Sequence, residues 1–107
     1  MKSNKNLVLI GMMASGKSTI GLLLAKKLNF KFFDVDMEIE NKTKKKIFEI
    51  FKIQGEKFFR NLEEKITLKL LNNNRCVVSL GGGGFLNEII RKKSLKNSLT
   101  VWLNWDS

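Results

Sequence analysis

Short apolar runs alternate along the chain with longer segments whose apolar residues recur at helical spacing. The first run, residues 7–10, is entirely apolar and ends at Gly11, which predicts a short strand buried on both faces. Over residues 17–28, apolar side chains recur every three or four positions, which predicts an amphipathic helix that stops at Asn29. The chain is therefore expected to begin with a strand that turns directly into a helix.

The same alternation continues through the rest of the chain. Residues 56–71 form the longest segment with helical spacing, and it has four apolar residues on one face: Phe59, Leu62, Ile66 and Leu70. The other expected elements are strand 30–35, helices 37–42 and 46–53 with a stop at Gly55, strand 76–80, helix 86–96 and strand 99–103. Strands separated by helices predict an α/β fold, a parallel sheet flanked by helices with right-handed crossovers.

Composition narrows the class of protein. The chain has 107 residues, of which 43% are hydrophobic, and this is the size and make-up of one globular domain. It has one cysteine, Cys76, and no histidine, so the chain alone cannot build an intramolecular disulfide, an ordinary zinc site or a histidine general base. We expect the thiol of Cys76 to be buried and inert, because this residue falls within a predicted strand. No apolar run approaches the ~20 residues that span a bilayer, and we expect a cytoplasmic protein with no membrane partner.

The charge balance is strongly basic. The chain has 20 Lys and Arg residues against 10 Asp and Glu residues, which gives a formal net charge of +10. Such a balance fits nucleic-acid binding, ligands that carry phosphate, or simply a lysine-rich solvated surface. No aromatic residues are interleaved with a basic stripe, so we expect no nucleic-acid partner and take the solvated surface as the default interpretation.

Residues 11–18 match the pattern G-x-x-x-x-G-K-[ST], in which a glycine-rich loop follows a strand and opens a helix. Gly11 and Gly16 permit the tight backbone path that turns N–H groups toward phosphate oxygens, and the helix N-terminus adds its positive dipole end. Lys17 supplies a cation for the terminal phosphates of a nucleotide, and Ser18 offers a hydroxyl to Mg²⁺. The alternative is an ordinary strand–turn–helix with a chance lysine.

Two of the three aspartates of the chain, Asp34 and Asp36, fall at the end of the second predicted strand. With a period of two, both carboxylates are expected on the same side of the extended chain. The carboxyl ends of parallel strands line the ligand site of an open α/β sheet, where Mg²⁺ and a nucleophile would need such groups. Alternatively, Asp36 caps the helix that begins at Met37.

Two further features are a glycine run at residues 81–84, after the third predicted strand, and Arg60 on the longest helix. Ordering four glycines costs chain entropy, so the run favours a backbone that closely approaches a small ligand, with a flexible connector as the alternative. The guanidinium fork of Arg60, one of only three arginines, can bind a carboxylate in a way that Lys cannot. Alternatively, Arg60 pairs on the helix surface with Glu56 or Glu64, four residues away on either side.

These four features, in this order and spacing, resemble the shikimate kinases. The strings that carry the resemblance are residues 11–21, 33–36, 55–63 and 79–83. The resemblance implies an incomplete P-loop kinase domain over residues 1–107, with the phosphate loop at 11–19 and a shikimate-binding helical segment at about 34–63. It also implies transfer of a phosphoryl group from ATP to the 3-hydroxyl of shikimate, in the pathway to the aromatic amino acids.

The resemblance also implies a role for each matching residue. The ATP phosphates would bind residues of the phosphate loop: Gly11, Ala14, Ser15, Gly16, Lys17, Ser18 and Thr19. Mg²⁺ would bind Ser18 directly and Asp34 through water. Lys17 and Asp36 would be catalytic, Asp36 by binding the reacting hydroxyl and orienting it or taking its proton. Arg60 would bind the shikimate carboxylate, and the glycine run would contact the substrate through its backbone at Gly81, Gly82 and Gly83.

Two departures from the family pattern bear on this expectation. Ala14 stands where the family usually has Gly, at a free position of the general motif. The family continues with an arginine-bearing lid, a second arginine for the carboxylate, an adenine-holding loop and a final strand and helix, so we expect residues 1–107 alone to be weakly active or inactive. We expect a monomer at full length. The alternatives are another small-metabolite P-loop kinase, such as a gluconate kinase, and a nucleotide-binding pseudokinase that catalyses nothing.

Overall fold

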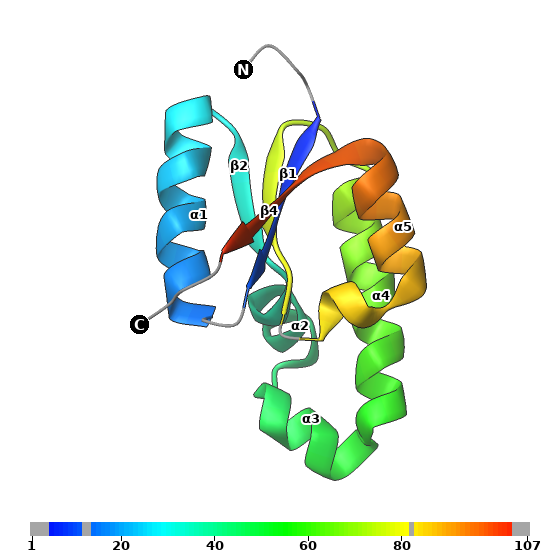
Figure 1. The fold of residues 1–107 in the computed structure, drawn as a ribbon. Helices are drawn as coiled ribbons and strands as arrows, with labels where there is room; N and C mark the ends of the chain where they lie inside the picture. Colours follow the sequence, from blue (N-terminus) through cyan, green and yellow to red (C-terminus); the bar gives the residue numbers. More distant parts are fainter. Residues whose placement is uncertain (1–4, 12–13, 82, 104–107) are drawn as a thin grey trace.

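The computed structural model describes residues 5–11, 14–81 and 83–103, with side chains described for residues 5–10, 19–81 and 83–101. Over these residues it contains four strands, five α-helices and one 3₁₀ helix (Figure 1): β1 (Asn6–Gly11), α1 (Ala14–Leu28), β2 (Lys31–Asp34), α2 (Val35–Thr43), α3 (Ile47–Gln54), α4 (Glu56–Leu71), β3 (Cys76–Ser79), η1 (Gly84–Leu86), α5 (Glu88–Asn97) and β4 (Ser98–Leu103). None of the helices in this described part has the length and apolar character needed to cross a membrane.

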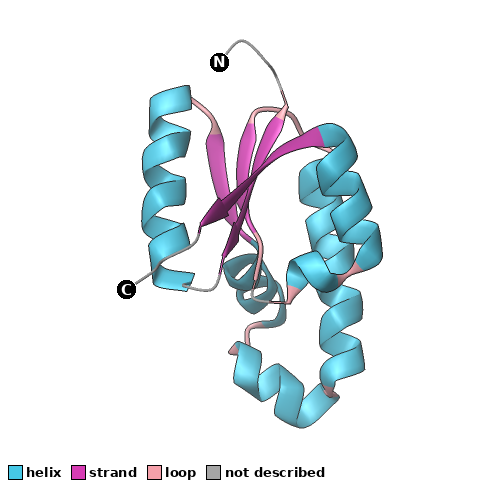
Figure 2. Ribbon diagram, in the orientation of Figure 1, coloured by secondary structure: helices cyan, strands magenta, loops and turns pink. Residues whose placement is uncertain are grey.

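The four strands form one parallel sheet in the order β2-β3-β1-β4 (Figure 2). In the centre, Leu7 of β1 pairs with Val77 of β3 on one side and with Leu99 of β4 on the other. Strand β2 lies beyond β3, so the chain leaves β1 toward one side of the sheet and, after β3, crosses to the other side. This arrangement confirms the predicted α/β fold with a parallel sheet flanked by helices.

Helices cover both faces of the sheet, as the buried apolar runs of β1 and β3 require. Side chains alternate along β1, where Leu7 and Leu9 pack in a cluster with α1, whereas Val8 and Ile10 pack in a larger cluster with α2, α3, α4 and α5. In Figure 1, α1 lies on one side of the sheet and α4 and α5 lie on the other. The core therefore has two layers, one on each face of the sheet. The segments with the candidate site residues lie where the strands end, at the edge of the sheet.

Helix boundaries differ from the sequence-based prediction mainly where helices begin. Helix α1 begins at Ala14, three residues before the predicted start, and α2 begins at Val35, two residues before it. Apolar spacing does not mark these starts, because a helix begins where N–H groups without a partner in the helix are capped, and because Val35, buried in the first turn of α2, also fits the end of a strand. The predicted stop at Gly55 is confirmed, since its φ of +90° lies in the left-handed region that favours glycine.

Cys76, at the start of β3, is 2% exposed, which confirms the prediction of a buried thiol. Burial raises the pKa of this thiol above its ordinary value, and the positive charge of Lys31 opposes that shift. A thiol held in its neutral form is a poor nucleophile, so Cys76 acts as a small apolar side chain in the core.

Candidate functional site

The carboxyl ends of the strands bring the candidate site segments to one edge of the sheet. Strand β1 ends at Gly11, β2 at Asp34 and β3 at Ser79, and each is followed directly by one of these segments. Because β1 and β3 are hydrogen-bonded neighbours, the phosphate-loop motif and the glycine run leave the sheet side by side. The strand order reverses at this same pair of strands, and ligands of open α/β sheets bind at such a reversal.

The phosphate-loop motif leads from β1 directly into α1. The backbone from Ala14 to Thr19 forms the first turns of α1, so the N-terminus of this helix lies at the carboxyl edge of the sheet. Unpaired N–H groups and the helix dipole favour phosphate at such a position. Residues 12 and 13 and the side chains of residues 11 and 14–18 lie outside the described residues. The phosphate-binding roles of residues 11–19, and the particular roles of Lys17 and Ser18, therefore stay predictions.

Asp34 and Asp36 lie on different elements. Asp34 is the last residue of β2 and the N-cap of α2, where its Oδ1 accepts a hydrogen bond from the Met37 N–H at 3.3 Å. Asp36 lies in the first turn of α2. The prediction of two carboxylates on one side of an extended chain is therefore wrong, and so is the alternative that Asp36 is the cap. The cap at Asp34 starts the helix one residue later, so the helical period and not the strand period places Asp36.

The glycine run lies against two of the other candidate residues. A Cβ atom added to Gly81 would be 2.5 Å from Asp36 Oδ1, and one added to Gly83 would be 2.6 Å from Arg60 Nη1. A larger residue at either position would displace the charged group beside it. Gly82 lies outside the described residues, and its predicted substrate contact stays a prediction. The loop backbone thus touches a carboxylate near its start and a guanidinium two residues later.

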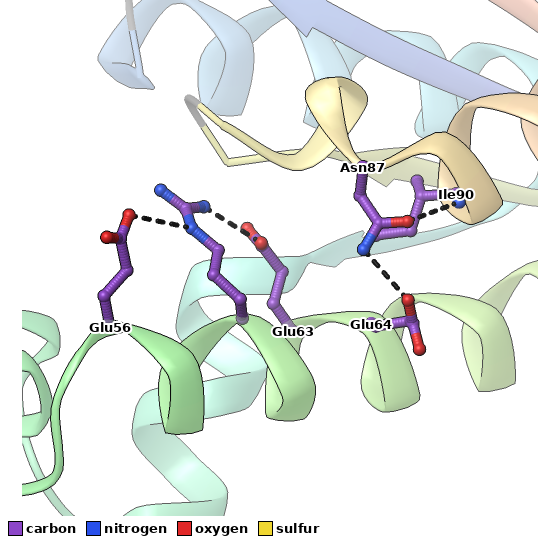
Figure 3. A network of polar contacts seen from close by, with 6 residues as sticks. Glu56, Glu63, Glu64, Asn87 and Ile90 are labelled. Carbon is purple, nitrogen blue, oxygen red and sulfur yellow. Dashed lines mark hydrogen bonds and ion pairs between the residues drawn. The ribbon is translucent and has the colours of Figure 1, made fainter.

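Arg60, on α4, is held by two carboxylates and two aromatic rings. Its Nη1 donates a hydrogen bond to Glu63 Oε1 at 3.0 Å, and its Nε lies 3.6 Å from Glu56 Oε2 (Figure 3). The guanidinium carbon lies 5.2 Å from the centre of the Phe59 ring and 6.0 Å from that of Phe51, within the range of cation–π attraction. The Arg60 side chain is still 39% exposed, so the guanidinium is fixed in place but open to a ligand.

Glu63 is the buried partner of Arg60, with a side chain only 2% exposed. Burial raises the pKa of the Glu63 carboxyl above its ordinary value of 4.5, although the hydrogen bond and positive charge of Arg60 oppose the shift. The charge of Asp36 adds a smaller upward contribution to this pKa. Of the two predicted surface pairs of Arg60, the one with Glu56 is confirmed. The one with Glu64 is wrong, because the Glu64 carboxylate accepts a hydrogen bond from Asn87 at 3.0 Å.

The sequence that carries this site matches a known protein family. A family model described as shikimate kinase matches residues 13–107. The chain belongs to the shikimate kinase family. It is 46% identical over 103 residues to the shikimate kinase of Bartonella henselae and 44% identical over 100 residues to that of Persephonella marina. These matches cover 96% and 94% of this chain but 49% and 61% of the two relatives, so the chain spans about half to three-fifths of their length.

Solved shikimate kinases share the fold. The structure of the Acinetobacter baumannii shikimate kinase in complex with shikimate matches this chain with a TM-score of 0.92 at 33% identity. That match covers 98% of this chain and 59% of the other. The Aquifex aeolicus shikimate kinase matches with a TM-score of 0.87 at 38% identity, covering 94% of this chain and 60% of that one. The predicted kinase-type α/β fold is confirmed by these matches.

Two of the residues that hold Arg60, Glu63 and Phe51, were not found from the sequence. Glu63 lies on the apolar face of α4, between Phe59 and Ile66. A carboxylate on that face, three residues after Arg60, could have indicated a buried partner for the arginine. Phe51 was assigned only to a short helix, and nothing in the local pattern indicates that its ring lies 4.7 Å from that of Phe59. Their roles depend on how α3 and α4 pack.

The described residues fit Mg²⁺ only as part of a shared coordination shell. Within residues 5–11, 14–81 and 83–103, no group of three or more His, Cys, Asp and Glu side chains could hold a metal ion. Mg²⁺ in kinases commonly takes one or two protein ligands and completes its shell with phosphate oxygens and water. The carboxylate of Asp34 lies at the same sheet edge as the N-terminus of α1 and suits that limited role.

Proposed function

We propose that the protein carrying this chain transfers the γ-phosphoryl group of ATP to the 3-hydroxyl of shikimate, giving shikimate 3-phosphate. The observation that carries this proposal is the glycine run, which lies against Asp36 at Gly81 and against Arg60 at Gly83. A carboxylate beside Gly81 and a guanidinium beside Gly83, both at partly exposed backbone, match a small acceptor with hydroxyls at one end and a carboxylate at the other. Membership of the shikimate kinase family and the relative solved with shikimate support the choice of acceptor.

Arg60 is suited to hold the carboxylate of the acceptor. A guanidinium has five N–H donors, and the hydrogen bond to Glu63 uses Nη1, so donors remain for a second carboxylate. The buried Glu63 carboxylate and the two phenylalanine rings fix the plane of the fork before the acceptor arrives. This preorganisation lowers the entropic cost of binding.

Asp36 is suited to act on the reacting hydroxyl. The first turn of α2 places its carboxylate against Gly81, at the same sheet edge as the N-terminus of α1. A carboxylate there accepts a hydrogen bond from a hydroxyl, orients its oxygen for attack, and takes the proton as the new bond forms. Phosphoryl transfer depends on positioning and charge neutralisation, so it needs no histidine or reactive cysteine.

The nucleotide side of the proposal rests on the phosphate-loop motif. The N–H groups at the start of α1 and the cation of Lys17 would bind the ATP phosphates, and Ser18 and Asp34 would hold Mg²⁺. The bound Mg²⁺ would neutralise charge on the phosphates. Phosphate held at α1 and a hydroxyl held at Asp36 then meet at the edge formed by the ends of β1, β2 and β3.

The direct test is a steady-state assay of the complete polypeptide that carries this sequence, with ATP, Mg²⁺ and either shikimate or gluconate as acceptor. We expect phosphorylation of shikimate and a rate with gluconate at least about a hundredfold lower, because gluconate does not match the spacing of carboxylate and hydroxyl. Comparable rates with gluconate would contradict the proposal in favour of another small-metabolite kinase. ATP binding with no transfer to either acceptor would contradict it in favour of a pseudokinase.

Arginine variants test the carboxylate site separately. Arg60→Lys keeps the charge but loses the fork, and we expect the KM for shikimate to rise about tenfold; Arg60→Ala should raise it about a hundredfold. Arg75→Ala is the matched control, because Arg75 lies over the Phe30 ring and directly precedes β3, at the edge of the sheet opposite the glycine run. A KM for shikimate that is unchanged in Arg60→Ala would contradict the assignment.

A further inference from the structure

Asn87 connects α4, which carries Arg60, to the segment that follows the glycine run and begins α5. Its Nδ2 donates a hydrogen bond to Glu64 Oε1 at 3.0 Å, across from α5 to α4, and both side chains are partly buried (Figure 3). Its Oδ1 accepts from the Ile90 N–H at 3.0 Å, so the same side chain is the N-cap of α5. Glu64 follows directly after Glu63, the buried partner of Arg60. Two consecutive carboxylates of α4 therefore bind the arginine and Asn87.

A chain of short backbone turns leads from Asn87 back to the glycine run. The Asn87 N–H donates to the Gly84 carbonyl at 3.2 Å, and the Leu86 N–H donates to the Gly83 carbonyl at 3.1 Å. The Gly84 N–H in turn donates to the Gly81 carbonyl at 3.1 Å. Because these bonds close consecutive tight turns, the position of Asn87 relative to α4 sets where the glycine run lies relative to Arg60 on the same helix.

The close packing at the glycine run leaves little tolerance for a shift of this run relative to α4. The Gly83 backbone is so close to Arg60 that a single added carbon would lie 2.6 Å from Nη1 and 2.8 Å from Nη2. At Gly84 an added carbon would lie 3.6 Å from Glu63 Oε2. A displacement of about 1 Å at this distance changes which guanidinium N–H groups an acceptor can reach.

We propose that Asn87 is a positioning residue for the acceptor site: through its hydrogen bond to Glu64 it fixes the distance between the glycine run and Arg60. The inference rests on the proposed function for its kinetic consequence and on the hydrogen bonds above for its structural one. Asn87 need not touch the substrate. It sets the geometry in which Arg60 and the backbone of the glycine run bind it together.

An exchange of donor and acceptor tests this role without removing the helix cap. Asn87→Asp keeps an oxygen that accepts from the Ile90 N–H, but it places a carboxylate opposite the carboxylate of Glu64. We expect the KM for shikimate to rise about tenfold, with the KM for ATP and kcat within about twofold of the wild type. In the double variant Glu64→Gln with Asn87→Asp, a glutamine N–H donates to the new carboxylate, and the KM for shikimate should return to within about threefold of wild type.

The other bridge between α4 and α5 provides a matched control. Lys93 Nζ donates to Asn72 Oδ1 at 2.6 Å, and this contact joins α5 to the C-terminus of α4, at the end away from the glycine run. Lys93→Ala removes a hydrogen bond between the same two helices, and we expect no change in the KM for shikimate. A purely structural role of Asn87 would make the two single variants behave alike, and that result overturns the inference.

A second readout keeps this inference separate from the proposed function. In ¹⁵N-labelled protein without substrate, Asn87→Asp should move the Arg60 Nε–Hε signal and the Gly83 amide signal, and the double variant should move both back. If the wild type does not phosphorylate shikimate, the proposed function fails, and these signals still decide the positioning role. Unchanged signals in Asn87→Asp, or no recovery of the signals in the double variant, overturn the inference.

Discussion

Asn6 at the amino edge of the sheet and Arg60 at the carboxyl edge both join elements that are far apart, but they use their polar atoms differently. The Asn6 side chain is 2% exposed, and its Nδ2 donates to the carbonyls of Leu71 and Asn73 at 3.1 and 2.8 Å. Its Oδ1 accepts from the Cys76 N–H at 3.0 Å. Both the nitrogen and the oxygen of this amide are thus bonded to protein backbone.

Arg60 is held as firmly but is left partly open. One face of its guanidinium lies over aromatic rings and Nη1 is bonded to a buried carboxylate, yet the side chain remains 39% exposed. This difference shows which edge of the sheet contributes to stability and which contributes to ligand binding. A saturated buried group stabilises the fold and has nothing to offer a ligand, whereas a fixed and partly exposed group has donors available for binding. We therefore expect changes at the amino edge to lower stability and changes at the carboxyl edge to lower affinity.

The largest effect is expected from Asn6→Ala. The substitution leaves two carbonyls and one N–H at the amino edge without their partner, and we expect the free energy of unfolding to fall by about 3 kcal/mol. Urea unfolding at neutral pH measures this loss. Asn61→Ala, at an exposed position on α4, is the matched control and should change stability by less than about 0.5 kcal/mol. If Asn6→Ala is as stable as Asn61→Ala, the claim that Asn6 stabilises the amino edge of the sheet is wrong.

Gly83→Ala should lower the affinity for shikimate more than it lowers stability. The new methyl group pushes the guanidinium toward solvent and weakens its bond to Glu63, so we expect stability to fall by about 1 kcal/mol, less than in Asn6→Ala. The displaced guanidinium should raise the KM for shikimate at least about tenfold. Gly55→Ala is the control: nothing lies near the new methyl group, but φ is +90°, so stability should fall while the KM stays constant. Loss of stability without loss of affinity in Gly83→Ala would contradict the expected division.

Glu63 gives a smaller effect that depends on pH. Its pKa is raised in the folded protein, so the folded state binds its proton more tightly than the unfolded state does. The resulting stabilisation is fully present below pH 4.5 and is lost as the pH rises through the folded-state pKa. We therefore expect the stability of the wild type relative to Glu63→Gln to increase as the pH falls from about 7 toward 4.5. Parallel urea titrations of the two proteins measure this difference, and a difference that rises with pH would show the sign to be wrong.

The smallest effect is expected at an exposed ion pair with the same separation as the Arg60–Glu63 bond. Lys92 Nζ lies 3.0 Å from Glu88 Oε1 on α5, and the two side chains are 74% and 64% exposed. We expect Lys92→Ala to change the free energy of unfolding by less than about 0.5 kcal/mol, and salt to weaken even that. A loss above about 1 kcal/mol would show that the distance between charges, and not burial, sets their value in this protein.

The order of elements and the sheet class could be predicted from the sequence, because apolar periodicity reports burial and burial decides both. The runs at 7–10 and 76–80 are apolar except for Ser79 and are buried on both faces, and both became central strands. Helix starts were predicted less well, since the cap at Asp34 begins α2 at Val35, a buried apolar residue that also fits the end of a strand. That single cap is why the two aspartates are not side by side as on a strand.

The candidate site could be predicted in its segments but not in its contacts. Arg60 and the glycine run are visible as local motifs, and the parallel topology brings them to one edge. The contact of Gly83 with the guanidinium, the burial of Glu63 and the bond from Asn87 to Glu64 depend on how α4 packs against α5 and the loop before it. Such packing joins residues about 20 positions apart, and no local periodicity encodes it.

The strand order has a consequence for synthesis on the ribosome. Both neighbours of β1 come late in the chain, since Leu7 pairs with Val77 and with Leu99, and β2 also has β3 as its partner. At about 5–20 residues per second, the first strand waits roughly 4–14 s before any partner strand has been made. During this interval an apolar segment with two unpaired edges is exposed, held only by the helix that follows it. We therefore expect chaperones that bind short apolar segments to bind the early part of this chain during synthesis.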